Sequence, residues 1–349
     1  MIGRKWLSCN RLKKMTRQDS TYLKGWAVLF MMFLHFGCDF VMPEYRYSWC
    51  GNDYAGAFQI CVPIFLFLSG YGLMAGSMNK EFAVFASFKK QVRRCFKLLK
   101  HYWIVITPFV ALALWMGKFA WSWKSLILTA TSLRCDWCPN AWFISLYIEL
   151  ILLFPFFFWI INRRNVKWNI CFLLFLVVIT KLLGKVGWID AEGGILSRQV
   201  KMFLIDMPIF VEGMLFAKYA IMQKILAKIK DVNPGFNLIW GGGISIVLAF
   251  VCRAKLPLIS VTELIHVPLC LFGLLLIASS RSLIYMAISY VGKYSTTLWL
   301  IHGYFCWTFL QPVIYSIRFW PLAYVVFVGI SLAFSIVIDK VRTLKLSFL

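Results

Sequence analysis

The chain has 349 residues, of which 61% are hydrophobic, 18% aromatic and only 15% charged, and its mean hydropathy is +0.76. A soluble domain of this size carries far more charge, so the composition excludes the soluble classes and indicates a polytopic membrane protein. The formal net charge of +23 would otherwise suggest a nucleic-acid partner, but the basic residues are distributed in a way that argues against nucleic acid.

Ten apolar segments are long enough to cross a bilayer as helices. The expected fold is therefore all-α, with about ten transmembrane helices in a single bundle. A basic N-terminal segment (1–20) precedes the transmembrane domain (21–339), and a short tail (340–349) follows it. The expected spans lie near 21–40, 54–76, 102–117, 141–161, 168–184, 201–220, 236–252, 261–280, 287–310 and 321–338.

The distribution of Lys and Arg among the connections indicates how the chain is oriented in the membrane. Alternate connections between the expected spans hold 24 Lys and Arg on one side and 11 on the other. Such an excess marks the cytoplasmic side, so both termini are expected in the cytoplasm of a multi-pass protein of the cell membrane. The basic loops also attract anionic lipid head groups. No cleavable signal sequence is expected, because about twenty polar residues precede the first apolar run.

The first expected span holds two ionisable residues on one face. Lys24 and His35 are eleven positions apart, a step that returns the helix to within about 20° of the same face and places the two residues about 16 Å apart along the axis. A titratable group at membrane depth is costly, so His35 is a candidate functional residue. The alternative is a histidine that only hydrogen-bonds a neighbouring helix.

The second and third expected spans add polar residues on the cytoplasmic side. Ser69 is expected near the cytoplasmic end of the second span, where it either binds a ligand or forms a small Ser-Gly packing pair with Gly70. The following connection is strongly basic and can act as an anion clamp, or it can be ordinary positive-inside flanking. Its basic residues are Lys80, Lys89, Lys90, Arg93, Arg94, Lys97 and Lys100.

The outer connection before the fourth span contains a C-x-x-C pair, Cys135 and Cys138. A metal site needs further ligands at matching spacing, and none is evident, so no metal is expected. A disulfide and two free thiols both remain open.

Further ionisable residues lie at membrane depth in the later spans. Asp206 or Glu212 can orient the imidazole of His35, or instead pair with Lys181 or Lys201 as structural contacts. Glu263 and His266, three residues apart, are typical of a local helical pair. His302 follows a Ser-Thr-Thr run and has either a supporting or a structural role.

Four short patterns, in the same order and in matching spans, resemble the membrane acyltransferase-3 family. Lys24 and His35 match its basic-x10-His signature, and CVPIFLFLSGYGL is similar to its F-F-x-x-S-G pattern. The segment RRCFK resembles its R-R-x-x-R, and Trp142 with Pro155 has its W-to-P spacing. Weaker support comes from Pro208, Phe210 and Gly213, and from Gly292, Ser295 and His302.

The resemblance implies an integral-membrane acyltransferase that moves an acyl group, usually acetyl, from acyl-CoA on the cytoplasmic side to a hydroxyl of a cell-surface polysaccharide or its lipid-linked precursor. Acetyl-CoA is then a donor substrate, and no permanently bound cofactor is implied. His35 is the expected catalytic base or covalent acyl carrier. Lys24, Arg93, Arg94, Lys97 and Ser69 are the expected donor-binding residues, with Trp142, Asp206, Glu212 and His302 in support.

The chain departs from the family pattern at three positions. Lys97 stands where Arg is usual and Lys100 where Pro is frequent, so bidentate phosphate binding is not expected there. Tyr147 replaces a Glu carried by one large branch. Two other classes remain open on the sequence: a transporter or flippase of lipid-linked sugars, in which buried charges line a path, and an inactive scaffold, which the retained His35 argues against.

Overall fold

The computed structural model describes residues 15–37, 41–48, 56–78, 84–185, 194–232, 237–256, 260–278 and 282–346. The described part of the chain is helical and contains no strand, which confirms the all-α prediction. Most of the basic N-terminal segment, together with Cys50, Lys80 and Arg281, lies outside the described residues.

The helices follow the expected spans in order. Those of the first half are α2 (Arg17–Phe36), α4 (Cys61–Ala75, preceded by the 3-10 turn η3, Phe58–Ile60), α5 (Val84–Trp115), α6 (Trp123–Ala130), α7 (Trp142–Arg163) and α8 (Val166–Lys185). Those of the second half are α9 (Gly194–Tyr219), α10 (Ile221–Val232), α11 (Leu238–Lys255), α12 (Ser260–Ala278), α13 (Leu283–Lys293), α14 (Ser295–Gly303), α15 (Gln311–Tyr315) and α16 (Trp320–Leu346). Short 3-10 turns lie at η2 (Pro43–Tyr45) and η4 (Pro139–Ala141).

Seven helices of the described part are long and apolar enough to cross a membrane. They are Phe58–Ala75, α5, α7, Val166–Leu183 of α8, α11, Val261–Ala278 of α12, and Trp320–Arg342 of α16. The chain is thus a multi-pass membrane protein. The expected count of ten stays a prediction, because α2 and α9 carry several charged residues and the expected ninth span is not one helix.

Helix α2 begins earlier than the apolar run because of a capping box. The Thr16 hydroxyl accepts a hydrogen bond from the Asp19 amide at 3.1 Å, and the Asp19 carboxylate accepts one from the Thr16 amide at 2.9 Å. These bonds satisfy N–H groups that a helix start leaves unpaired. The helix therefore starts at Arg17, four residues before the expected span, and carries Lys24 within its body.

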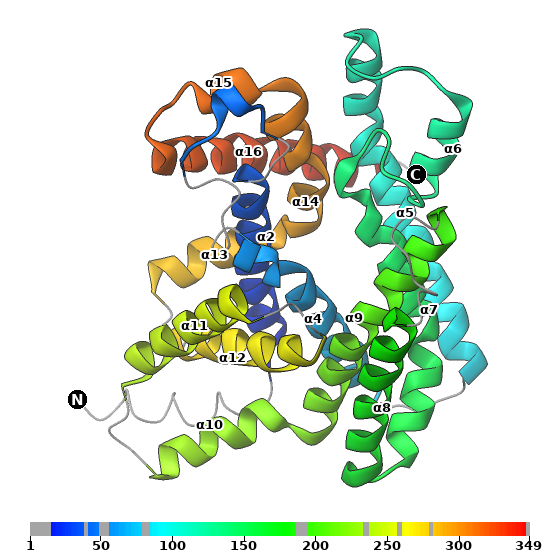
Figure 1. Ribbon diagram of the computed structural model, residues 1–349, viewed down its shortest axis with the longest axis vertical. Helices are drawn as coiled ribbons and strands as arrows, with labels where there is room; N and C mark the ends of the chain where they lie inside the picture. The colour runs from blue at the N-terminus through cyan, green and yellow to red at the C-terminus, as the bar shows by residue number, and fades with distance from the viewer. Residues whose placement is uncertain are drawn as a thin grey trace.

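Helix α2 runs through the middle of the molecule and contacts α4, α12, α13, α14 and α16, whereas α5, α7, α8 and α9 form a group on one flank (Figure 1). Its apolar face is fully buried, including Leu23, Ala27 and Met32. His35, near the C-terminal end of this central helix, is therefore surrounded by elements from distant parts of the chain.

Glycines allow three helix pairs to approach closely. A Cβ at Gly70 of α4 would collide with the Phe210 carbonyl of α9, and one at Gly213 of α9 would collide with the Phe67 carbonyl of α4. Gly242 and Gly273 play the same role between α11 and α12, as do Gly25 and Gly292 between α2 and α13. Small residues let backbones meet where lipid supplies no hydrophobic drive. Gly70 thus has the packing role that the Ser-Gly pair indicates.

The stretch 287–310, expected as one span, is broken. It consists of the end of α13, the separate helix α14, and a π-helical turn, η5 (Tyr304–Phe309). Such π segments are rare and are frequent at functional sites. His302 lies in the last turn of α14, directly before the π-helical turn.

Candidate active site

Two histidines that are 267 positions apart in the sequence form a hydrogen bond in the membrane domain. The Nδ1 atom of His35 lies 2.7 Å from the Nε2 atom of His302. The two rings are nearly parallel, at an interplanar angle of 5°. His302 is fully buried, so the pair is shielded from solvent on that side.

The surrounding bonds assign the protons of this pair. The Nδ1 atom of His302 lies 3.1 Å from the Leu298 carbonyl, and a carbonyl only accepts, so Nδ1 of His302 carries a proton. In a neutral His302, Nε2 is then the acceptor, and His35 donates to it through Nδ1. The lone pair of a neutral His35 therefore resides on Nε2, which is the nitrogen that can take a proton or attack a carbonyl.

Trp307, in the π-helical turn, fixes the backbone and ring of His35. Its indole N–H donates to the His35 carbonyl at 3.2 Å, and its ring packs edge-on against the imidazole at 4.9 Å between centroids. The π-helical turn thus supplies a side chain that contacts both the backbone and the ring of His35.

A cavity of about 230 Å³ lies next to His35. Four of the sequence-predicted site residues line it: Lys24, His35, Ser69 and Trp142. Its other lining residues are Met31, Leu34, Gln59, Cys61, Val62, Phe65, Leu98, Asn140, Phe143, Tyr147, Ser295, Thr296 and Trp299. The cavity is mostly apolar with a few polar groups, as small-molecule sites are. Lys24 and His35 therefore share one cavity as well as one helix.

Lys24 adds a positive charge to the cavity wall. It has no carboxylate partner among the described residues. An ammonium group in this position favours an anionic ligand, since burying an unpaired charge is costly.

The hydroxyl proton of Ser69 is donated to a backbone carbonyl of its own helix. Its hydroxyl donates to the Phe65 carbonyl at 2.8 Å and lies 3.4 Å from the Tyr147 hydroxyl. Because Ser69 has a single proton, Tyr147 is the donor in the second contact. Ser69 lines the cavity as expected, but it offers a ligand an acceptor more readily than a donor.

The basic residues of the second connection lie on α5. Arg93, Arg94 and Lys97 are exposed, and none of them lines the cavity, although Leu98, one turn beyond Arg94, does. Arg94 donates to Gln91 at 3.1 Å and lies close enough to Tyr147 to interact with it electrostatically. This places Arg94 beside the cavity, on the part of α5 where charged ligands can reach it.

Asp206 and Glu212 do not contact His35. Asp206 is buried in electrostatic contact with Glu263 and Arg253, and Arg253 donates to Glu263 at 3.2 Å. Glu212 is buried as well, and its Oε2 atom has no hydrogen-bond partner in the described part. The expected local pair of Glu263 with His266 is replaced by this bond between α11 and α12, because Arg253 offers Glu263 a full positive charge.

A closed polar ring that the sequence did not indicate fixes the start of α14. Arg342 donates to His101 Nδ1 at 3.0 Å, His101 Nε2 lies 3.2 Å from the Thr297 hydroxyl, and that hydroxyl donates to Asp339 at 3.0 Å. Arg342 closes the ring with an ion pair to Asp339 at 3.6 Å. The ring ties α5 and α16 to α14 and so holds Ser295 and Thr296 at the cavity.

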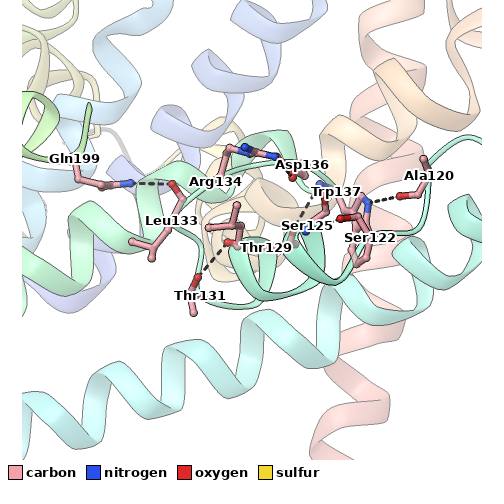
Figure 2. A network of polar contacts seen from close by, with 11 residues as sticks. Ala120, Ser122, Ser125, Thr129, Thr131, Leu133, Arg134, Asp136, Trp137 and Gln199 are labelled. Atoms are coloured by element: carbon pink, nitrogen blue, oxygen red, sulfur yellow. Dashed lines mark hydrogen bonds and ion pairs between the residues drawn. The ribbon is translucent and has the colours of Figure 1, made fainter. Parts of the chain in front are cut away.

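The connection between α6 and α7, which contributes Asn140 to the cavity, is held by a polar network (Figure 2). Arg134 makes two hydrogen bonds to Asp136, at 2.5 and 2.6 Å, and Gln199 of α9 donates to the Leu133 carbonyl at 3.3 Å. The Arg134 guanidinium holds the pKa of Asp136 below its ordinary value. The stabilisation from this ion pair is present at neutral pH and is lost as the pH falls through that lowered pKa.

Cys135 and Cys138 of this loop are free thiols. Burial raises the pKa of Cys138 to about 12 and that of Cys135 to about 11, so both stay protonated near neutral pH. Among the described residues, no group of three or more His, Cys, Asp or Glu side chains could hold a metal ion.

One of three comparisons with known proteins identifies the family of this chain. The sequence profile of the membrane acyltransferase-3 family, described as an acyltransferase domain, matches residues 18–340, nearly the whole chain. The chain belongs to this family. It is therefore a membrane acyltransferase, as the sequence patterns predicted. No curated protein sequence and no solved structure matches it.

Proposed function

We propose that this acyltransferase moves an acetyl group from acetyl-CoA on the cytoplasmic side of the cell membrane to a hydroxyl of a cell-surface polysaccharide or of its lipid-linked precursor. The observation that carries the proposal is the cavity that combines the basic nitrogen of His35 with the ammonium of Lys24. A proton acceptor and an anion-binding group are what acyl transfer from a phosphate-bearing thioester to a hydroxyl requires.

In the proposed reaction His35 acts as general base. Its Nε2 atom removes the proton of the acceptor hydroxyl, the oxygen attacks the thioester carbonyl, and the departing thiolate takes the proton back from His35. His302 accepts the Nδ1–H bond throughout and stabilises the imidazolium that forms in between. A covalent acyl-histidine would use the same Nε2 atom, and trapping of a labelled, base-labile acyl group on His35 would reveal it.

In this proposal the donor is bound by Lys24 in the cavity wall and by Arg94 beside the cavity. Lys24 lies about 16 Å along α2 from His35, at 1.5 Å per residue. The flexible arm of the coenzyme separates its phosphates from its thioester, so the phosphates can stay near Lys24 and Arg94 while the thioester reaches His35. Arg93 and Lys97 add positive charge on the exposed side of α5.

The alternative of a lipid-linked sugar transporter has no support in the site, since a substrate path would not need a histidine pair with assigned protons. Family membership favours acyl transfer. Both termini are proposed to lie in the cytoplasm, on the distribution of basic residues.

The test is transfer of radiolabelled acetyl from acetyl-CoA to surface glycan in membranes that contain the protein. His35→Ala should abolish transfer at normal protein abundance. His266→Ala is the matched control, because His266 is also a buried histidine of the membrane domain but lies outside the cavity. Transfer by the His35 variant at the wild-type rate would refute the assignment of the base.

A further inference from the structure

One buried hydrogen-bond donor in the cavity has no partner. Asn140, in the 3-10 turn η4 just before α7, is 3% exposed and lines the cavity beside His35. Its Nδ2 atom has no hydrogen-bond acceptor among the described residues. A buried amide without a hydrogen-bond partner is destabilising, so its position in a cavity indicates a ligand that accepts a hydrogen bond.

The amide of Asn140 lies close to the residue that follows His302, and Asn140 and His35 line the same cavity. The Nδ2 atom is 2.5 Å from the position that a Cβ of residue 303 would occupy. That residue is Gly303, which directly follows His302, and His302 holds His35 at 2.7 Å. Only a residue without a side chain leaves room for the amide at this point, so Gly303 lets Asn140 approach the end of α14 that presents the pair.

The segment that leads into the turn carrying Asn140 is held by hydrogen bonds. The Tyr304 hydroxyl donates to the Trp137 carbonyl at 2.7 Å, and the Trp137 amide donates to the Thr129 hydroxyl at 3.4 Å. The Tyr102 hydroxyl donates to the Thr129 carbonyl at 2.7 Å. A donor fixed in advance by its surroundings stabilises developing charge without reorganising, which is the property of an oxyanion-binding group.

Three other polar side chains of the cavity are less suited to this role. The proton of Ser69 is donated to the Phe65 carbonyl, and that of Tyr147 to Ser69. Gln59, the second carboxamide of the cavity, is exposed. Asn140 is thus the buried amide donor whose proton is available to a ligand.

We propose that Asn140 is a catalytic residue, whose side-chain N–H donates to the carbonyl oxygen of the acyl group while that oxygen carries negative charge. The proposal rests on the proposed function. When the acceptor oxygen loses its proton to His35 and bonds to the thioester carbon, the carbonyl π pair moves to its oxygen, and the Asn140 N–H binds this oxyanion. As the pair returns, the carbon–sulfur bond breaks, and the thiolate receives the proton from His35.

The experiment compares Asn140→Ala and Asn140→Asp with the wild type in kcat and KM of acetyl transfer to glycan in native membranes. Asn140→Asp keeps the shape of the side chain but has no N–H to donate. Removing one oxyanion donor lowers kcat about 10²- to 10³-fold, and we expect this loss in both variants with KM for acetyl-CoA changed by less than about threefold. Binding of a non-cleavable ketone analogue of acetyl-CoA should be retained.

Asn169→Asp is the matched control. Asn169 is a buried asparagine whose amide donates to the Ile161 carbonyl at 3.0 Å and to the Tyr219 hydroxyl at 2.6 Å, outside the cavity. It should lower thermal stability without lowering kcat of the folded protein. A wild-type kcat in both Asn140 variants would overturn the oxyanion role and leave the proposed function intact, as would a loss that appears only as a raised KM. Failure of the wild type to transfer acetyl would overturn the proposed function itself.

Discussion

Replacement of His302 tests the central feature of the site, the hydrogen bond between two buried imidazoles. His302→Ala removes the acceptor that lies 2.7 Å from Nδ1 of His35. His35 gains a proton in the transition state, so the bond is then made by a charged donor. Hydrogen bonds to charged groups contribute about 1.5–3 kcal/mol, and each 1.36 kcal/mol is a factor of ten in rate. We therefore expect kcat to fall by about 12- to 160-fold.

The assay is kcat of acetyl transfer at saturating acetyl-CoA, normalised to the amount of folded protein. His302→Gln retains a side-chain acceptor and should recover part of the rate, whereas a purely structural role for His302 would make both variants lose stability together. Thermal melting of each purified variant separates these cases. A stable His302→Ala protein with the wild-type kcat would refute the argument that His302 sets the protonation of His35.

Three further perturbations probe donor binding and the buried charges. Lys24→Ala should raise KM for acetyl-CoA about tenfold or more with little change in kcat, and Lys24→Arg should be partly tolerated because the charge is kept; equal KM values in both variants and wild type would contradict this. The double variant Arg93→Gln and Arg94→Gln should bind acetyl-CoA more weakly than the wild type in isothermal titration, and this difference should shrink at high salt. Unchanged affinity would mean that these residues only set the membrane orientation. Arg253→Met should destabilise the fold by about 3–5 kcal/mol because it leaves Glu263 buried without its partner, and adding Glu263→Gln should restore most of the loss in thermal melting.

The site residues that the sequence could predict are those whose relation depends on local spacing along one helix. The eleven-residue step from Lys24 to His35 fixes one helix face whatever surrounds it, and the structure brings both residues to one cavity with Ser69 and Trp142. The role of His302 could only be offered as an alternative, since its partner is 267 positions away and no local pattern marks the pair.

Other features escaped the sequence because tertiary contacts decide them. The break between α13 and α14 was missed in a continuous apolar run, although the β-branched pair at Thr296 and Thr297 and the glycines nearby were compatible with it. Asn140 was overlooked because an asparagine in a turn usually bonds its own backbone. Its proposed role depends on a side-chain N–H group without a hydrogen-bond acceptor, which can be seen only in the packed structure. Asp206 was considered for His35, yet Arg253 of α11 lies nearer and offers a full charge.

The arrangement of the site also bears on how a reaction with substrates on two sides of a membrane can occur. Under the predicted orientation, Lys24 lies toward the cytoplasmic end of α2 and His35 near its outer end, while Asn140 enters from an outer loop. Lys24 and His35 lie on the same helix, α2, and line the same cavity. In the proposed reaction the coenzyme's arm therefore carries the acetyl group along α2 from the end near Lys24 to His35. The sugar need not cross the membrane at all. In the proposed reaction, the acyl group therefore needs no separate transporter, because the coenzyme's arm covers the distance along α2 between Lys24 and His35.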